Sequence, residues 1–229
     1  MPVATTTSPM PREAILAAVR AALGDVAQTA VVAPAAGSPL SVAPVERARL
    51  LAGFTAEARA VGTVVHAASS ADDAGRTLAT ILADVAAARV VVWPTPLARR
   101  VAHTAAPAGV EVLVAAPGTA VDAVAQADVG VTEADALIAA SGTLVLRAAS
   151  GARTVSLLPP LHVAVVPSAR IVPDLATALR AARGSAGAPD TCLTLISGPS
   201  RTADIEKKLV VGVHGPCALH VILVDDAEG

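Results

Sequence analysis

Two glycine–proline turns near the C-terminus, Gly198-Pro199 and Gly215-Pro216, carry the densest polar chemistry of the sequence. The first turn follows a predicted strand and continues into Ser200, Arg201 and Thr202. A junction of strand, glycine loop and helix exposes backbone N–H groups that suit an anion, and a guanidinium adds a forked donor. His214, in the second turn, can donate or accept a proton near neutral pH. The two turns therefore predict an anion site with a proton-handling group beside it.

The segment between the turns has the charge order of a short helix over 201–210. Asp204 and Glu206 fall in its first turn, a lysine pair follows, and Gly212 can end it. Acids near the start and cations further along stabilise a helix, so these charges need no ligand. The alternative is that Asp204 or Glu206 orients His214 for catalysis.

A second polar cluster spans Gly130–Asp135 and Ser141–Thr143. The acids Glu133 and Asp135 could act as a base or as hydrogen-bond acceptors. The backbone and hydroxyl groups of Ser141, Gly142 and Thr143 could bind an anion, and Thr132 and Asp135 are counted with them as ligand-binding candidates. The alternative is structural: Thr132 caps a short helix whose first turn contains Glu133 and Asp135.

A third candidate is Arg153, which precedes the apolar run "LLPPLHVAVV". Its guanidinium could pair with a carboxylate or phosphate through two parallel hydrogen bonds, or it could form a structural ion pair. His162 leads into an apolar strand, and that position is more typical of a core histidine than of a catalyst.

Predicted strands and helices alternate along the chain from residue 45. These elements must position the side chains described above. Short valine-rich strands alternate with helices of 8–18 residues, which predicts a parallel sheet covered on both faces. The predicted helices are 46–62, 71–88, 96–106, 120–127 and 173–183, and the predicted strands are 63–68, 89–93, 109–116, 191–197 and 218–224. In such sheets ligands bind outside the carboxyl ends of the strands, so we expect the polar turns there.

The organisation that follows is a single α/β domain over 45–229. Residues 1–44 are expected to form a disordered start, a helix with an apolar stripe around Ile15, Leu16 and Val19, and a Pro/Ala-rich connector. That helix could pack on another subunit, so a homo-oligomer stays open.

Composition excludes several classes of function. The net charge is −2 and there is one Phe, one Trp and no Tyr, which disfavours nucleic acid and anionic membranes as partners. No apolar run approaches the roughly 18 residues of a membrane helix, and the first residues lack a signal-peptide pattern, so we expect a cytoplasmic protein. Cys192 and Cys217 lack metal-ligand spacing, so no metal or cofactor is expected within this chain.

Four segments together resemble the LUD (lactate utilization domain) family: "VGVTEADALIAASGTLVL", "SLLPPLHVAVV", "LISGPSRTADIEKKLVVGVHGP" and "LHVILV". The resemblance covers about residues 45–225. Besides the residues named above, the signature includes Pro159, and Ala140-Ser141 depart from it because the family commonly has an acid and Thr before Gly-Thr. A catalytic base at that position would be missing from this chain.

The resemblance implies a three-layer α/β/α fold with a mostly parallel sheet, akin to the sugar-phosphate isomerase and CoA-transferase superfamily. It also implies a cytoplasmic bacterial protein that oxidises L-lactate to pyruvate with an iron–sulfur partner and a cysteine-rich partner. Iron–sulfur clusters are then expected on the partner subunits, and a small carboxylate or phosphate in the pocket of this chain.

Two other functions stay open. The chain could be a stand-alone enzyme for sugar phosphates or acyl-CoA, although a shared fold is a poor warrant for activity. It could also be a non-catalytic scaffold whose polar loops dock the iron–sulfur subunits.

Overall fold

The computed structural model describes residues 12–23, 44–106, 109–116, 118–183, 192–203 and 209–225. The chain divides into two compact units, Met1–Pro34 and Ala35–Gly229. Helix α1 (Arg12–Leu23) belongs to the first unit, and its Ile15, Leu16 and Val19 are exposed. The expected disordered start and most of the connector lie outside the described residues.

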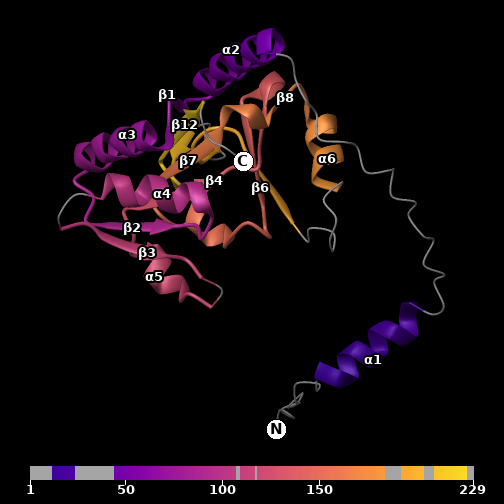
Figure 1. The fold of residues 1–229 in the computed structure, drawn as a ribbon. Coiled ribbons are helices and arrows are strands. Elements are labelled where there is room, and N and C mark those ends of the chain that lie inside the picture. The colour runs from indigo at the N-terminus through magenta and orange to yellow at the C-terminus, as the bar shows by residue number, and fades with distance from the viewer. Residues whose placement is uncertain are drawn as a thin grey trace. The chain divides into compact units, whose positions relative to one another are not determined.

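The second unit is built on a six-stranded sheet in which every neighbouring pair of strands is parallel (Figure 1). Its order is β1-β12-β7-β4-β2-β3. The strands are β1 (Val64–Ala68), β12 (Ala218–Val224), β7 (Leu161–Pro167), β4 (Val129–Glu133), β2 (Arg89–Val92) and β3 (Glu111–Val114). Valine runs form these strands because β-branched side chains pack well on a sheet that is buried on both faces.

A second sheet and the helices cover this one. The second sheet has the order β8-β5-β6-β9. Its strands are β8 (Ile171–Val172), β5 (Ala136–Ile138), β6 (Thr143–Arg147) and β9 (Leu193–Ile196). The helices of the unit are α2 (Pro44–Ala60), α3 (Ala71–Asp84), α4 (Pro96–Ala105), α5 (Val121–Ala125) and α6 (Leu175–Arg183). The predicted α/β class with three layers and a mostly parallel sheet is confirmed.

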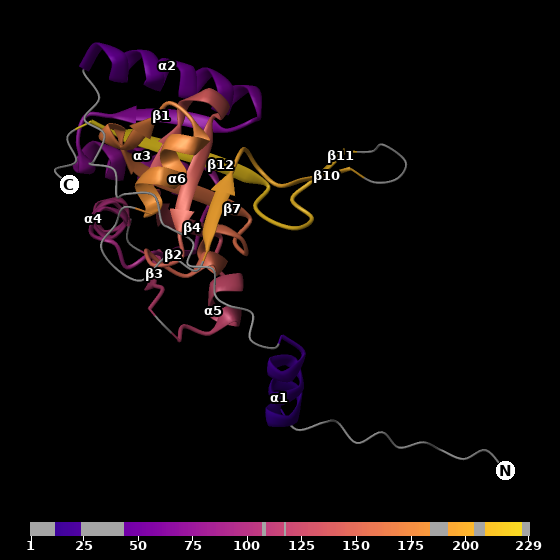
Figure 2. The same ribbon diagram turned by 90° about the vertical axis from the view of Figure 1, so that its right-hand side faces the viewer.

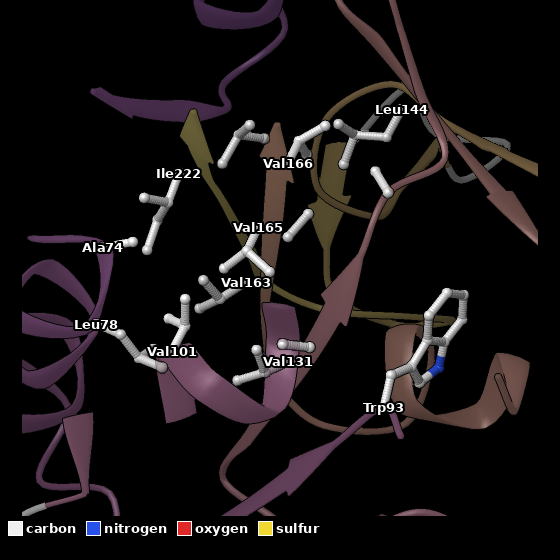
Figure 3. Close-up of a cluster of buried hydrophobic side chains, with 14 of the residues drawn as sticks. Ala74, Leu78, Trp93, Val101, Val131, Leu144, Val163, Val165, Val166 and Ile222 are labelled. Carbon is white, nitrogen blue, oxygen red and sulfur yellow. The ribbon is translucent and has the colours of Figure 1, made fainter. Parts of the chain in front are cut away.

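The core lies on both faces of the six-stranded sheet (Figure 3). Helices α3 and α4 lie side by side on one face, where Leu78 and Val101 pack near Val163. On the other face lie Trp93 and Leu144, both fully buried. α3 begins where the sequence places it, because the Ser70 hydroxyl accepts a hydrogen bond from the Asp73 N–H and acids occupy its first turn.

The helix predicted over 201–210 is wrong. Strands β10 (Arg201–Ala203) and β11 (Leu209–Val211) pair in an antiparallel ladder and project from the body (Figure 2). Residues 204–208 lie outside the described residues. No helix in the described part of the chain is long and apolar enough to cross a bilayer.

Candidate functional site

A groove of about 370 Å³ brings together several of the predicted site residues. We call it the Arg153 groove. It is lined by Arg153, Ser156, Leu157, Thr194, Leu195, Ile196, Ser197, Gly198, Ser200, His214, Gly215 and Pro216. Three segments far apart in the sequence supply these residues: the 3-10 turn η2 (Arg153–Ser156), β9 with its following turn, and the turn before β12.

The two glycine–proline turns are joined directly. The backbone N–H of Ser200 donates to the carbonyl oxygen of Pro216 at 2.9 Å, and the N–H of Gly212 donates to the carbonyl oxygen of Ser200 at 2.9 Å. Gly198 has a φ of +82°, in the left-handed region that favours glycine. A Cβ on Gly215 would lie 3.1 Å from the Cβ of Ser200, so glycine is what lets the turns approach this closely.

The groove lies at the amino ends of β7 and β12, and the predicted location at the carboxyl ends of the strands is wrong for these turns. Pro216 precedes β12, and η2 precedes β7. The N–H of Cys217 donates to the carbonyl oxygen of Pro160 at 2.8 Å, so the residues that directly precede β12 and β7 are hydrogen-bonded to each other. The physical reason is that the predicted strand 191–197 does not join the parallel sheet: β9 pairs antiparallel with β6 in the second sheet.

Arg153 gives the groove a positive charge, and His214 adds an imidazole. Arg153 is exposed, and none of the described residues lining the groove is acidic. Its Nη1 donates only a weak hydrogen bond to the Cys192 thiol, at 3.6 Å, so donors remain for a ligand. His214 is exposed and lines the same groove, beside Gly215. The groove therefore offers a guanidinium and an imidazole to a small anion.

A second recess of about 230 Å³ adjoins the groove and shares Arg153, Ser156 and Thr194 with it. Trp93 forms its wall and donates its indole N–H to the carbonyl oxygen of Ala152 at 2.9 Å. A Cβ on Gly151 would lie 2.6 Å from the indole ring. The loop that carries Arg153 is thus fixed against a buried aromatic ring.

Arg201 points elsewhere. Its Nη2 donates to the carbonyl oxygen of Val61, in the turn between α2 and β1, and it does not line the groove. Thr202 lies within β10, and the two acids proposed to orient His214, Asp204 and Glu206, lie outside the described residues. Arg153 is therefore the cation that the structure places in the groove.

Ser141, Thr143 and Ser197 form a chain of hydroxyl groups behind the groove. The Thr143 hydroxyl lies 2.7 Å from the Ser141 hydroxyl and 2.7 Å from the Ser197 hydroxyl. Only Ser197 lines the groove. Gly142 has a φ of +59°, and a Cβ there would lie 2.2 Å from the backbone nitrogen of Ala58, so it permits close packing against α2.

Thr132 and Asp135 serve the fold. The Thr132 hydroxyl lies 2.8 Å from Nε2 of His162 in the buried core, where burial lowers the pKa of His162 to about 3. Asp135 accepts hydrogen bonds from the Arg147 N–H and the Ser150 hydroxyl, and burial raises its pKa against those bonds. The helix-cap alternative is wrong, because Thr132 and Glu133 end β4 and β5 starts at Ala136.

Several residues that line the groove carry no motif in the sequence. Thr194 reaches the groove through the pairing of β9 with β6, and Ser156 reaches it on η2, whereas Cys192 lines only the adjoining recess. Ser197 could have been found, since it directly precedes Gly198. Among the described residues no group of three metal-ligating side chains comes together, and both cysteines are free thiols.

The fold and the groove define an α/β protein with a cationic groove at the amino ends of two central strands. The profile of the LUD domain matches residues 51–224, and the chain belongs to the LUD domain family. A solved structure with the same architecture is a DUF162 family protein from Deinococcus radiodurans. It is 26% identical, with a TM-score of 0.60, and the match covers 81% of this chain and 99% of that one.

Relatives of known name share part of the chain. Lactate utilization protein C of Halalkalibacterium halodurans is 45% identical over 105 residues, which are 44% of this chain and 46% of that protein. Lactate utilization protein C of Macrococcus caseolyticus is 48% identical over 105 residues, with the same coverage. Lactate utilization protein C of Bacillus subtilis is 44% identical over 105 residues, 44% of each chain. The matched part spans about half the length of these relatives.

Proposed function

We propose that this chain is a cytoplasmic component of a bacterial lactate utilization system, which oxidises L-lactate to pyruvate together with partner subunits that hold iron–sulfur clusters. The observation that carries the proposal is the sequence identity of 44–48%, over 105 residues, to proteins named lactate utilization protein C. The Arg153 groove supports it independently, because lactate and pyruvate are small carboxylates, the groove offers a guanidinium, and none of the described residues that line it is acidic.

In this proposal Arg153 binds the carboxylate through its forked N–H donors. The Ser200 hydroxyl lines the same groove and can donate to the ligand, while His214 holds or accepts a proton at the ligand's hydroxyl or carbonyl oxygen. Oxidation of lactate to pyruvate releases two electrons and two protons, and iron–sulfur clusters on the partner subunits would accept the electrons.

Deletion of the gene in the source organism tests the pathway. Growth on L-lactate is expected to be lost, while growth on a sugar persists, and wild-type protein restores it. Arg153→Ala is expected to fail to restore growth, whereas Arg201→Ala restores it, because Arg201 lies outside the groove. Undiminished growth of the deletion strain on L-lactate would remove the proposal.

Two alternatives have their own outcomes. Turnover of a sugar phosphate or an acyl-CoA by the purified chain, without partners, would replace the proposal with a stand-alone enzyme. A pure scaffold would be indicated if Arg153→Ala and His214→Ala abolish assembly with the partner subunits while neither changes the affinity for any small anion.

A further inference from the structure

A larger groove lies on a different part of the surface from the Arg153 groove. It has a volume of about 540 Å³ and runs between α4 and the edge strand β3. We call it the α4–β3 groove. Its apolar lining consists of Val92, Pro94, Pro96, Ala102, Ala106, Val112 and Val114. The lining extends from Pro94, before α4, to Ala106, after it, and a helix of 10 residues is about 15 Å long. The groove is therefore elongated.

β3 forms an open edge of the sheet beside this groove. Among the described strands it pairs only with β2. The N–H groups of Glu111 and Ala115 donate to carbonyl oxygens of Ala88 and Val92 on the β2 side. Because N–H directions alternate along a strand, the N–H groups of Val112 and Val114 point outward and are open to another strand.

The side chains of this edge are also open. Val112 is 38% exposed and Val114 is 37% exposed. Exposed apolar edge strands are templates for pairing, and soluble proteins ordinarily shield them with charge, proline or a covering segment. Within the described ranges no strand pairs with the outer edge of β3.

The wall of the groove formed by α4 is cationic. Arg99, Arg100 and His103 line it, and all three are exposed. Arg100 forms an exposed ion pair with Asp72, at 3.3 Å, which is worth little. Within the described part of the chain Arg99 has no acidic partner, and the lining contains no acid. Complementarity of charge therefore favours an acidic occupant.

We propose that the α4–β3 groove binds an extended, acidic and apolar segment of a partner protein, which adds a strand to β3 and places carboxylates against Arg99 and Arg100. Strand addition of this kind uses main-chain hydrogen bonds for affinity and side-chain pockets for specificity. A second copy of this chain fits less well, because a symmetric β3–β3 pair would bring two cationic walls onto one face of the joined sheet. The proposal concerns another face than the Arg153 groove and stands without the proposed function.

The test uses the full chain and a short synthetic peptide of alternating glutamate and valine, with a lysine–valine peptide of equal length as control. Fluorescence anisotropy is expected to show the acidic peptide binding at least tenfold more tightly than the basic one, with affinity falling as salt is raised. Arg99→Glu is expected to weaken binding at least tenfold. Arg49→Glu, an exposed charge reversal on α2, leaves it unchanged.

A backbone variant tests strand addition itself. Val114→Pro removes an outward N–H without touching the β2 ladder, so it is expected to abolish binding, whereas Val114→Ala keeps the N–H and retains most of it. Circular dichroism checks that both variants fold, and if Val114→Pro does not, Val112→Pro takes its place. Equal binding of both peptides, no binding of the acidic peptide, or insensitivity to the proline overturns the proposal. A wild-type dimer that the proline converts to a monomer also overturns it, in favour of a second copy.

Discussion

Ser200 and Pro216 are joined by a backbone hydrogen bond of 2.9 Å, although 15 residues separate them in the sequence. This bond holds the two glycine–proline turns together as one lip of the Arg153 groove. Because the turns meet at the amino ends of β7 and β12, two neighbouring strands of the parallel sheet position them. Ser200 and His214 therefore face a ligand from a fixed backbone.

Gly215→Ala tests this approach of the two turns. The added Cβ would lie 3.1 Å from the Cβ of Ser200 and 3.4 Å from its hydroxyl, so the turns must separate by a few tenths of an ångström. We expect several-fold weaker binding of small anions and a loss of less than about 1 kcal/mol in the free energy of unfolding. Calorimetric titration and urea unfolding of the same samples measure both. A large stability loss with unchanged binding would show that the turn serves only the fold.

Gly142 is expected to be indispensable for packing. In Gly142→Ala the Cβ would lie 2.2 Å from the Ala58 nitrogen, at a φ of +59°, and we expect a loss of about 3 kcal/mol or more in unfolding free energy. Gly118→Ala is the matched control, since its φ is +89° but nothing lies within 4 Å of the Cβ. It should cost only about 1–2 kcal/mol. Equal losses in urea unfolding would refute the contact with α2 as the cause.

The ion pair between Glu133 and Arg170 joins a buried carboxylate to a half-buried guanidinium. Oε1 of Glu133 lies 2.8 Å from Arg170 Nη2, and its other oxygen is buried without a hydrogen bond. Arg170→Ala should destabilise the chain by about 3–5 kcal/mol, because a carboxylate stays buried and unpaired. Adding Glu133→Leu should recover much of that loss. A double variant no more stable than Arg170→Ala would contradict this reading.

His162 predicts a loss of stability in acid. Its pKa is about 3 in the folded chain, below the ordinary value of 6.5, so the unfolded chain binds the extra proton between these values. The contribution of His162 to the free energy of unfolding is fully present above pH 6.5. It falls as the pH drops toward 3, by up to about 1.4 kcal/mol per pH unit. His66 and His220 shift in the same direction through partial burial, so the comparison must isolate His162.

The comparison is His162→Gln against wild type, by urea unfolding from pH 7 to pH 4.5. The difference in unfolding free energy between the two proteins should shrink steadily below pH 6.5. A constant difference across that range would mean that His162 is not held neutral by the core.

Much of the fold could be read locally. The valine runs at 89–93 and 218–224 and the capped helix after Ser70 are where periodicity and capping place them. The ladder at 201–211 could not be read this way, because its charge order equally satisfies a helix. The hydrogen bond from Gly212 to Ser200 extends the pairing of β10 with β11, and the bond from Ser200 to Pro216 anchors it to the opposite turn. These contacts with distant residues favour the strand over the helix.

The site was predicted in parts. Arg153, the Gly198 turn and the His214 turn meet in one groove, but its position at the amino ends depends on β9 leaving the parallel sheet for β6. Such pairing between distant segments has no local signal. Thr132 and Asp135 carried the right polar types for a site, yet burial turned them into hydrogen-bond partners of His162 and Ser150.

The most direct test is calorimetric titration of the purified chain with L-lactate, pyruvate and inorganic phosphate, in wild type, Arg153→Ala and Arg201→Ala. We predict that a carboxylate binds wild type, that Arg153→Ala weakens it at least tenfold, and that Arg201→Ala changes it less than about twofold, since a charged hydrogen bond lost from the ligand is worth about 1.5–3 kcal/mol. Affinities that are the same in wild type and Arg153→Ala would contradict the account.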